Sequence, residues 1–349
     1  MKKTMIPVLF FLCLLTAKAV FAQTALYDDF QSYPAGRFQD SGLWDIQEKS
    51  ETGGNISVES SGSNQFIKNE IVYKTGYEKS DSFLQSVVLG GADNWMLSTS
   101  VCVPEDSQGS LHVVLRGSGE ASSNTMYLCT ITRSKITYLP YCDNSVADAL
   151  SGGSWFRLDI RINWNTGEIR IYRDGSLKRT DKNYRSASAG KYHTFQTGSF
   201  SLRMYTTVPK TNGYRAISYY DNIYCCADIS SNADISISSP FFTLNLNDRV
   251  IPVNSIRKGS LNGKFFCRTY DGTRRSIFIV SAVFHGKELV KSTVLSTATE
   301  ESDIFDLRLP TESLSSAEEM KLFIWSDMQP LTLPQTYSVS SYTLSLIHI

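Results

Sequence analysis

Residues 155–164 read WFRLDIRINW, and apolar and polar side chains alternate along the whole segment. The apolar positions share one face of an extended chain: Phe156, Leu158, Ile160, Ile162 and Trp164. The polar positions share the other: Arg157, Asp159, Arg161 and Asn163. Because successive side chains of a strand point to opposite faces, the segment predicts a β-strand that is buried on one side.

Turns and further alternating segments surround this strand. Asn165-Thr166-Gly167 and Asp174-Gly175 contain residues that tolerate positive φ, so we expect hairpins that continue through residues 169–173 and 176–180. The period of two recurs elsewhere: 95–103, 111–116, 126–132, 136–141 and 200–205. No convincing helical stripe is present. The sequence predicts an all-β fold in which two sheets pack face to face.

A polar, serine-rich segment divides the chain near residues 227–239, just before Pro240. We expect a first domain over 23–228, a linker over 229–239 and a second domain over 240–337. Strands of the second domain are predicted in six segments: 241–246, 261–270, 276–285, 288–295, 303–309 and 320–325. About 100 residues with strands at this spacing predict a smaller, immunoglobulin-like β-sandwich.

The amino terminus has the pattern of a signal peptide. Lys2 and Lys3 precede an apolar run over residues 5–15, and Val20-Phe21-Ala22 places small residues at the cleavage positions. The run is shorter than the roughly 20 residues that a membrane-spanning helix needs. We therefore expect residues 1–22 to be removed and the mature protein to be secreted, with no membrane span.

The last residues have an unusual sequence. Residues 344–349 read LSLIHI, which matches one translated frame of a transposon end common in sequencing libraries. We expect a tail over 338–349 whose last six residues are an artefact. The natural chain would then continue past about Thr343, and a covalently attached catalytic domain would be lost by truncation. The alternative, a genuine apolar strand, stays open.

Charge and cysteine content limit the partners and the chemistry. Six cysteines follow the predicted signal peptide, and they are either buried thiols or disulfides in one of 15 pairings. Lysine and arginine number 34 and aspartate and glutamate also number 34, so the formal net charge is zero. No basic run occurs beyond the signal peptide, and nucleic acid is therefore not an expected partner.

Three segments of the first domain resemble the concanavalin A-like lectin and glucanase superfamily, in its LamG-like bacterial form. They are the opening YDDFQSYPAG at 27–36, the hairpin over 155–175 and the YYDNI segment at 219–223. The resemblance covers about residues 25–228 and implies a jelly-roll sandwich. In the second domain, residues 274–295 and KLFIWSDMQPL at 321–331 are similar to an accessory β-sandwich of secreted carbohydrate-active proteins, which implies a packing role.

Catalytic patterns of that superfamily are missing from this sequence. Its glycosidases carry acidic residues on alternate positions of one strand, and no E-x-D-x-x-E segment occurs here. The K-A-G-x-Y-x-Q strand of its lyases is matched only in part, by AGKYH at 189–193. We expect no catalytic residue and a non-catalytic polysaccharide-binding segment of a larger extracellular protein. A lyase or hydrolase, on this jelly roll or in a missing domain, and a structural or adhesive surface protein remain alternatives.

Glycan binding is predicted on the polar face of the 155–164 strand. Aromatic rings stack on sugar faces, and planar polar groups pair with hydroxyls. The predicted binding residues lie on strands of the first domain: Arg157, Asp159, Arg161, Asn163, Tyr172, Arg203 and Tyr205. An excess of arginine on this face would favour an acidic glycan. The alternative, that this is the convex and solvated face, stays open.

The resemblance also implies a structural calcium ion. In many sugar-binding jelly rolls the opening and closing strands lie side by side and share Ca²⁺, which prefers carboxylate and carbonyl oxygens. The matching carboxylates here are Asp28, Asp29 and Asp221. We therefore expect these three residues to form a structural calcium site, and we expect no other cofactor.

Overall fold

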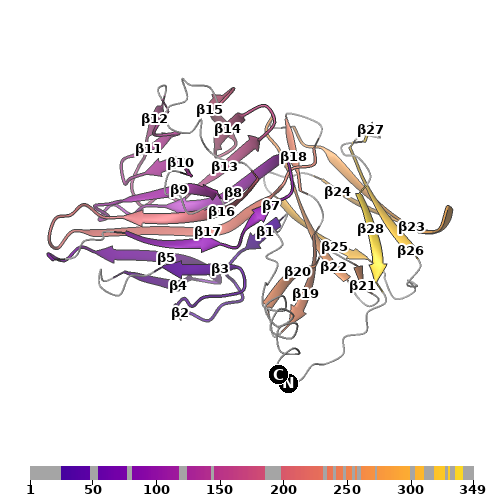
Figure 1. Cartoon of the computed structure of the whole chain (residues 1–349), viewed down its shortest axis with the longest axis horizontal. Helices are drawn as coiled ribbons and strands as arrows, with labels where there is room; N and C mark the ends of the chain where they lie inside the picture. Colours follow the sequence, from indigo (N-terminus) through magenta and orange to yellow (C-terminus); the bar gives the residue numbers. More distant parts are fainter. Residues whose placement is uncertain are drawn as a thin grey trace, which may run out of the picture.

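The computed structural model describes most of the chain between Ala25 and Ser340. The described ranges are 25–47, 54–76, 81–117, 124–142, 145–184, 198–230, 234–238, 241–246, 249–253, 256–257, 261–271, 273–298, 303–309, 318–326, 329–330 and 335–340. The predicted signal peptide, the AGKYH segment and residues 344–349 lie outside them. All regular structure in the described ranges is β, in two sandwiches that Figure 1 shows side by side.

The first sandwich consists of a nine-stranded and an eight-stranded sheet, called sheet 1 and sheet 2. Sheet 1 runs in the order β15 (Ser176–Asp181), β14 (Glu168–Arg173), β13 (Phe156–Asn163), β8 (Asn94–Cys102), β17 (Arg215–Ala227), β5 (Asn64–Val72), β4 (Asn55–Ser61) and β2 (Gly36–Arg37), with β1 (Ala25–Asp28) also on β17. Sheet 2 runs in the order β12 (Val146–Ala149), β11 (Lys135–Tyr138), β10 (Thr125–Ile131), β9 (Ser110–Gly117), β16 (Ser199–Thr207), β6 (Asp81–Ser86) and β3 (Trp44–Gln47), with β7 (Leu89–Gly90) also on β16.

The alternation of β13 explains how this sandwich is held together. Leu158, Ile160 and Ile162 are buried in the same core cluster as Leu202 and Met204 of β16 in sheet 2. Burial of apolar side chains between two sheets is the main driving force for such a fold. The predicted all-β fold, a jelly-roll sandwich followed by a smaller β-sandwich, is confirmed.

The hairpins beside β13 form where the turn residues predict them. Gly167 has φ of 75° between β13 and β14, and Asp174 and Gly175 have φ of 50° and 79° between β14 and β15. Positive φ at both central residues defines the tight turn that suits the twist of paired strands. Glycine and aspartate tolerate this conformation, so the local sequence sets the register of sheet 1 at this edge.

The second sandwich is smaller and again has two sheets. Its five-stranded sheet runs β18 (Ile235–Ile237), β22 (Leu261–Thr269), β19 (Phe241–Leu246) and β20 (Arg249–Val253), with β25 (Asp303–Leu309) on β22. Its six-stranded sheet runs β21 (Ile256–Arg257), β28 (Gln335–Ser340), β26 (Glu318–Ser326), β23 (Ser276–His285) and β24 (Glu288–Ala298), with β27 (Gln329–Pro330) on β26.

Two boundaries differ from the expected domain limits. Strand β18 lies inside the predicted linker, and an isolated bridge pairs Asp228 with Ser238 across it. Strand β28 continues to Ser340, three residues into the predicted tail. Serine-rich composition favours a loop, but it does not prevent alternating Ile235 and Ile237 from pairing with β22.

The structure describes all six cysteines that follow the predicted signal peptide. All six are buried thiols outside any disulfide: Cys102, Cys129, Cys142, Cys225, Cys226 and Cys267. Burial raises the pKa of the Cys102 thiol to about 11, so it behaves as an apolar side chain at neutral pH. Among the described residues, no helix is long and apolar enough to cross a membrane.

Candidate functional site

The residues predicted to bind glycan lie on two different sheets. Arg157, Asp159, Arg161, Asn163 and Tyr172 belong to β13 and β14 of sheet 1, whereas Arg203 and Tyr205 belong to β16 of sheet 2. The outer faces of the two sheets of a sandwich point in opposite directions. The structure therefore does not bring these seven residues together in one site.

Asp159 lies beneath the second sandwich. Its side chain is fully buried, and it accepts hydrogen bonds from Ser98 Oγ at 2.6 Å and from Arg157 Nε at 3.0 Å. Arg268 of β22 reaches across from the second sandwich to form an ion pair with the same carboxylate. A buried ion pair requires both charges to be compensated, so this contact fixes β22 against the outer face of sheet 1.

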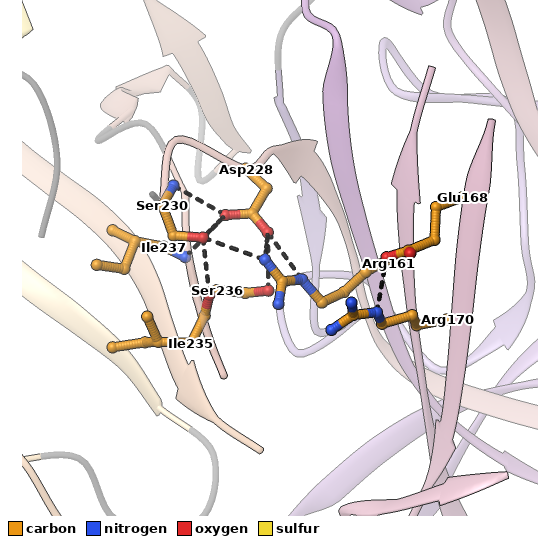
Figure 2. A network of polar contacts seen from close by, with 8 residues as sticks. All are labelled: Arg161, Glu168, Arg170, Asp228, Ser230, Ile235, Ser236 and Ile237. Atoms are coloured by element: carbon orange, nitrogen blue, oxygen red, sulfur yellow. Dashed lines mark hydrogen bonds and ion pairs between the residues drawn. The ribbon is translucent and has the colours of Figure 1, made fainter. Parts of the chain in front are cut away.

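Neighbouring residues extend the same joint between the sandwiches. The ring of Tyr172 stacks on that of Tyr270, with centroids 4.2 Å apart and an interplanar angle of 24°. Figure 2 shows Arg161 reaching Asp228, whose Oδ2 atom lies 3.1 Å from Arg161 Nε, and Ser230, whose Oγ atom lies 3.2 Å from Arg161 Nη2. Glu168 and Arg170 form a separate ion pair of 2.7 Å on the adjoining strand.

Asp228 completes this network from the end of the first sandwich. Its Oδ1 atom accepts hydrogen bonds from Ser230 Oγ at 2.7 Å and from Ile237 N at 3.2 Å, and its Oδ2 atom accepts one from Ser236 Oγ at 2.9 Å. Much of the polar face of β13 is therefore a joint between two sandwiches, which neither alternative, a concave binding face or a convex solvated face, predicts. Asn163 instead accepts a hydrogen bond from Thr166 N at 2.9 Å and shapes the turn. Glycan binding by the residues of β13 and β14 stays a prediction.

The outer face of sheet 2 carries a continuous row of aromatic rings. Phe83, Tyr205 and His112 lie opposite one another on β6, β16 and β9, with centroids 6.1 Å and 5.6 Å apart. The row continues from His112 to Tyr127 at 5.5 Å and from Tyr127 to Tyr141 at 5.0 Å, both edge to face. We call this surface the sheet 2 patch; it consists of Phe83, Gln85, His112, Arg116, Tyr127, Tyr141, Arg203 and Tyr205.

Strand periodicity and one bulge place these side chains outward. On β16, Arg203 and Tyr205 alternate with Leu202 and Met204, which are buried in the core. On β10 the register shifts between Tyr127 and Cys129. The extra residue lets both Leu128 and Cys129 face the core while Tyr127 stays on the outer face.

Arg203 is the central cation of the patch. Its Nε atom donates to Gln85 Oε1 at 3.1 Å, Nη2 donates to the same oxygen, and the guanidinium carbon lies 3.7 Å from the centre of the Phe83 ring. Burial, together with the charge of Arg116, lowers the pKa of Arg203 to about 10. The group stays charged at neutral pH, but it is held by neutral partners.

The acid–base groups of the patch already have partners within the protein. The ring nitrogens of His112 lie 3.0 Å from Thr130 Oγ1 and 3.0 Å from Thr207 Oγ1, and burial lowers its pKa to about 4. Tyr205 donates its hydroxyl to Asp81 Oδ2 at 3.0 Å, and burial raises its pKa. His112 is therefore a neutral, positioned ring near pH 7, and Tyr205 is a hydrogen-bond donor rather than a base.

His112 makes the folded protein sensitive to acid. Because its pKa of about 4 is below the usual 6.5, protonation favours the unfolded chain, and stability is lost as the pH falls from about 6.5 to 4. We expect His112→Gln to remove about 2 kcal/mol of the stability difference between pH 7 and pH 4.5. Urea unfolding at the two pH values measures this stability difference. The control is His285→Gln, which lies at an exposed strand end and should leave the difference unchanged. An unchanged pH difference in His112→Gln contradicts the expectation.

Sequence reasoning found two members of the patch and missed six. The strands over 111–116 and 126–132 were predicted. Alternation places His112 and Arg116 on the same face of the first strand, and it assigns Tyr127 to one face of the second. A single strand does not show which other strands lie beside it. The order β6–β16–β9–β10 depends on long-range pairs such as Tyr205 with Phe83 and Tyr205 with His112, and these pairs assemble the patch.

A second group of rings lies on the outer face of sheet 1. Phe66 contacts Trp155 and Tyr219 edge to face, each with centroids 5.5 Å apart. The cation beside them, Lys68, forms ion pairs with Glu59 at 3.0 Å and Glu70 at 3.1 Å. This group differs from the sheet 2 patch because its positive charge is compensated within the protein.

The carboxylates expected to hold calcium have different surroundings. Asp28 is buried, and its oxygens accept hydrogen bonds from Phe30 N at 2.9 Å, Tyr33 Oη at 2.8 Å and Trp44 Nε1 at 2.7 Å. Burial raises its pKa to about 6. The donors use both oxygens of Asp28, and calcium binding by this residue stays a prediction. In the ranges given above, no group of three or more acidic, histidine or cysteine side chains is arranged to hold a metal.

Asp29 and Asp221 lie near each other where β1 and β17 meet. Asp29 contributes to raising the pKa of Asp221, after burial as the main cause, and Asn64 Nδ2 donates to Asp221 Oδ2 at 2.9 Å. The side-by-side pairing of the opening and closing strands agrees with the expectation from sequence. Calcium binding by Asp29 and Asp221 stays a prediction.

Comparisons with known proteins give only distant likenesses. No family model and no curated protein matches the chain. Among solved structures it is similar to a sialidase, with TM-score 0.43 and 11% identity over 59% of this chain and 19% of that one. It is also similar to an endo-β-1,3-glucanase from Pyrococcus furiosus, with TM-score 0.40 and 11% identity over 57% of this chain and 92% of that one. A third similar structure is a glycoside hydrolase family 16 endo-glucanase from Bacteroides ovatus, with TM-score 0.38 and 12% identity over 57% of this chain and 98% of that one. The chain thus spans about a fifth of the sialidase that it matches.

Proposed function

We propose that the chain is a secreted, non-catalytic polysaccharide-binding segment that binds its ligand on the sheet 2 patch. The observation that carries the proposal is the row of rings from Tyr205 through His112 and Tyr127 to Tyr141, which is flanked by Gln85 and two arginines. Phe83, at the end of the row, is 5% exposed beneath Arg203 and supports that arginine. Aromatic faces pack against the apolar faces of pyranoses, and amide or guanidinium groups pair with their polar substituents. The signal-peptide pattern of residues 1–22 supports secretion.

The arrangement of acids supports binding without cleavage. Asp45 of β3 and Asp81 of β6 lie on the same face of sheet 2 as the patch, and Asp45 pairs with Gln85, four residues along β6 from Asp81. At about 3.3 Å per residue the two positions are roughly 13 Å apart. Glycosidases place their two carboxyl groups about 5 to 9.5 Å apart, so this pair does not fit either mechanism.

The open surface of the patch limits the expected affinity for a polysaccharide. Tyr141 is 46% exposed, and the patch lies on the outer face of a sheet, where each sugar contact stays partly hydrated. We expect dissociation constants from micromolar to millimolar, which corresponds to about 4 to 8 kcal/mol.

Removing two rings is expected to weaken polysaccharide binding about tenfold. Each aromatic contact contributes about 0.5 to 1.5 kcal/mol, so Tyr127→Ala combined with Tyr141→Ala loses about 1 to 3 kcal/mol. The full chain without residues 1–22 is run by affinity electrophoresis in gels that contain neutral or acidic polysaccharides.

A matched variant on the other sheet shows whether the effect belongs to the patch. Trp155→Ala removes a ring that is 44% exposed on sheet 1, and we expect it to leave retardation unchanged. Loss of retardation in Trp155→Ala alone places the site on sheet 1 instead. Release of reducing ends or unsaturated products overturns the non-catalytic part of the proposal.

A further inference from the structure

Two arginines of the sheet 2 patch form no direct ion pair among the described residues, although the charge of Asp81 acts on Arg203 from a longer distance. Arg203 lies opposite Val114, and Arg116, two residues along β9, lies opposite Ser201, so the arginines are diagonal neighbours across the β16–β9 pair. Neither forms an ion pair with a carboxylate of the described residues. Burial is the main cause of the lowered pKa of Arg203, and the nearby charge of Arg116 lowers it further.

Other arginines of the same chain are neutralised. Eight of them form ion pairs with aspartate or glutamate: Arg157, Arg161, Arg170, Arg173, Arg179, Arg215, Arg268 and Arg275. The two patch arginines therefore depart from the usual arrangement in this protein. Holding half-buried like charges together costs free energy, and that cost is recovered when an anion binds between them.

The donors of Arg203 are only partly used. A guanidinium group has five N–H donors, and Gln85 Oε1 accepts two of them. The residues described here offer no acceptor to the other three. Gln85 and Phe83 hold the guanidinium in place without neutralising it. A planar, pre-positioned fork of this kind matches the oxygens of a carboxylate or a sulfate ester.

We propose that the sheet 2 patch binds an acidic polysaccharide, with Arg203 and Arg116 together binding the anionic group of a sugar whose ring lies against Tyr127 or Tyr205. The proposal rests on the proposed function and names its ligand class. A carboxylate and a sulfate ester both present at least two oxygens that share a negative charge to the guanidinium groups, and the polymers used in the test distinguish these two sources.

The test compares polymers that differ only in charge. The full chain without residues 1–22 is titrated with polygalacturonate and its carboxyl-reduced form, and with dextran sulfate and dextran. We expect at least tenfold tighter binding to one charged polymer than to its neutral partner. Raising the salt from 50 to 500 mM weakens that binding, because the contact is ionic.

Charge-matched variants separate a specific site from general attraction. Arg203→Gln with Arg116→Gln is expected to lower the affinity for the charged polymer at least tenfold, and Arg203→Lys to lower it less. The control, Arg37→Gln with Arg133→Gln, removes the same charge from exposed positions outside the patch. Thermal unfolding shows that each variant is folded.

The outcomes also separate this inference from the proposed function. Equal binding to charged and neutral polymers overturns the acidic ligand and leaves polysaccharide binding in place. Equal loss in the patch and control variants overturns the role of Arg203 and Arg116. If no polysaccharide of a broad panel is bound, both proposals fail.

Discussion

Arg268→Ala is expected to lower the free energy of unfolding by about 3 to 5 kcal/mol. The change leaves the carboxylate of Asp159 buried at 0% exposure without its partner from the second sandwich, and Arg157 and Ser98 supply only the remaining contacts. Arg157, the cation that remains, is partly exposed, so a fully buried carboxylate that loses its buried partner costs more than a lost surface contact. Urea unfolding of the full chain, followed by tryptophan fluorescence, measures the loss.

Two further variants test whether the buried charge is the cause. Asp159→Asn combined with Arg268→Met removes both fully buried charges and should restore most of the lost stability, because the cation that then loses its partner, Arg157, has a side chain that is 24% exposed to water. Arg275→Ala breaks an ion pair with Asp271 whose side chains are 21% and 30% exposed, and we expect less than about 1 kcal/mol there. If Arg268→Ala costs no more than Arg275→Ala, the joint is not held by this pair.

Asp28→Ala is expected to destabilise the first sandwich by a similar amount, about 3 to 5 kcal/mol. The carboxylate accepts hydrogen bonds from Phe30 N, Tyr33 Oη and Trp44 Nε1, and its removal leaves three donors in a buried region without an acceptor. Each such orphaned group costs about 1 to 3 kcal/mol, partly offset by rearrangement. Thermal unfolding followed by near-ultraviolet circular dichroism of Trp44 and its neighbours reports the change.

The adjacent aspartate provides the control. Asp29 is only half-buried and accepts hydrogen bonds from Tyr27 Oη at 2.5 Å and Gln31 N at 3.1 Å, so Asp29→Ala should cost about 1 kcal/mol. Adding calcium separates this structural role from a metal site. If calcium raises the unfolding temperature of the parent protein but not of Asp28→Ala, Asp28 is a ligand and the hydrogen-bond explanation is wrong.

Sequence patterning predicted the strand at 155–164, its buried face and its turns, because these depend on neighbours only a few positions away. It did not predict what covers the polar face. Arg268 and Tyr270 lie about 100 residues further along the chain, and their contacts with Asp159 and Tyr172 follow from how two sandwiches dock. An alternating polar face reads the same whether water, sugar or another domain covers it.

The residues of the candidate site could not be grouped from the sequence either. Alternation places Arg203 and Arg157 outward on their own strands, but it does not show that one belongs to sheet 2 and the other to sheet 1. The bulge at Tyr127 also changes which side chains of β10 face the core beyond that point, and a strict period of two does not predict such a change. The ring row is therefore visible only once the strand order is known.

The joint made by Asp159, Arg268, Tyr172 and Tyr270 gives the molecule a mechanical property. A hinge between domains bends under a small load, whereas a buried ion pair and a stacked ring pair must break before the sandwiches can rotate. If sheet 2 holds a polymer as proposed, a pull on that polymer is transmitted to the second sandwich without rotation at this joint. The joint therefore keeps the direction of the outer face of sheet 2 fixed relative to the second sandwich.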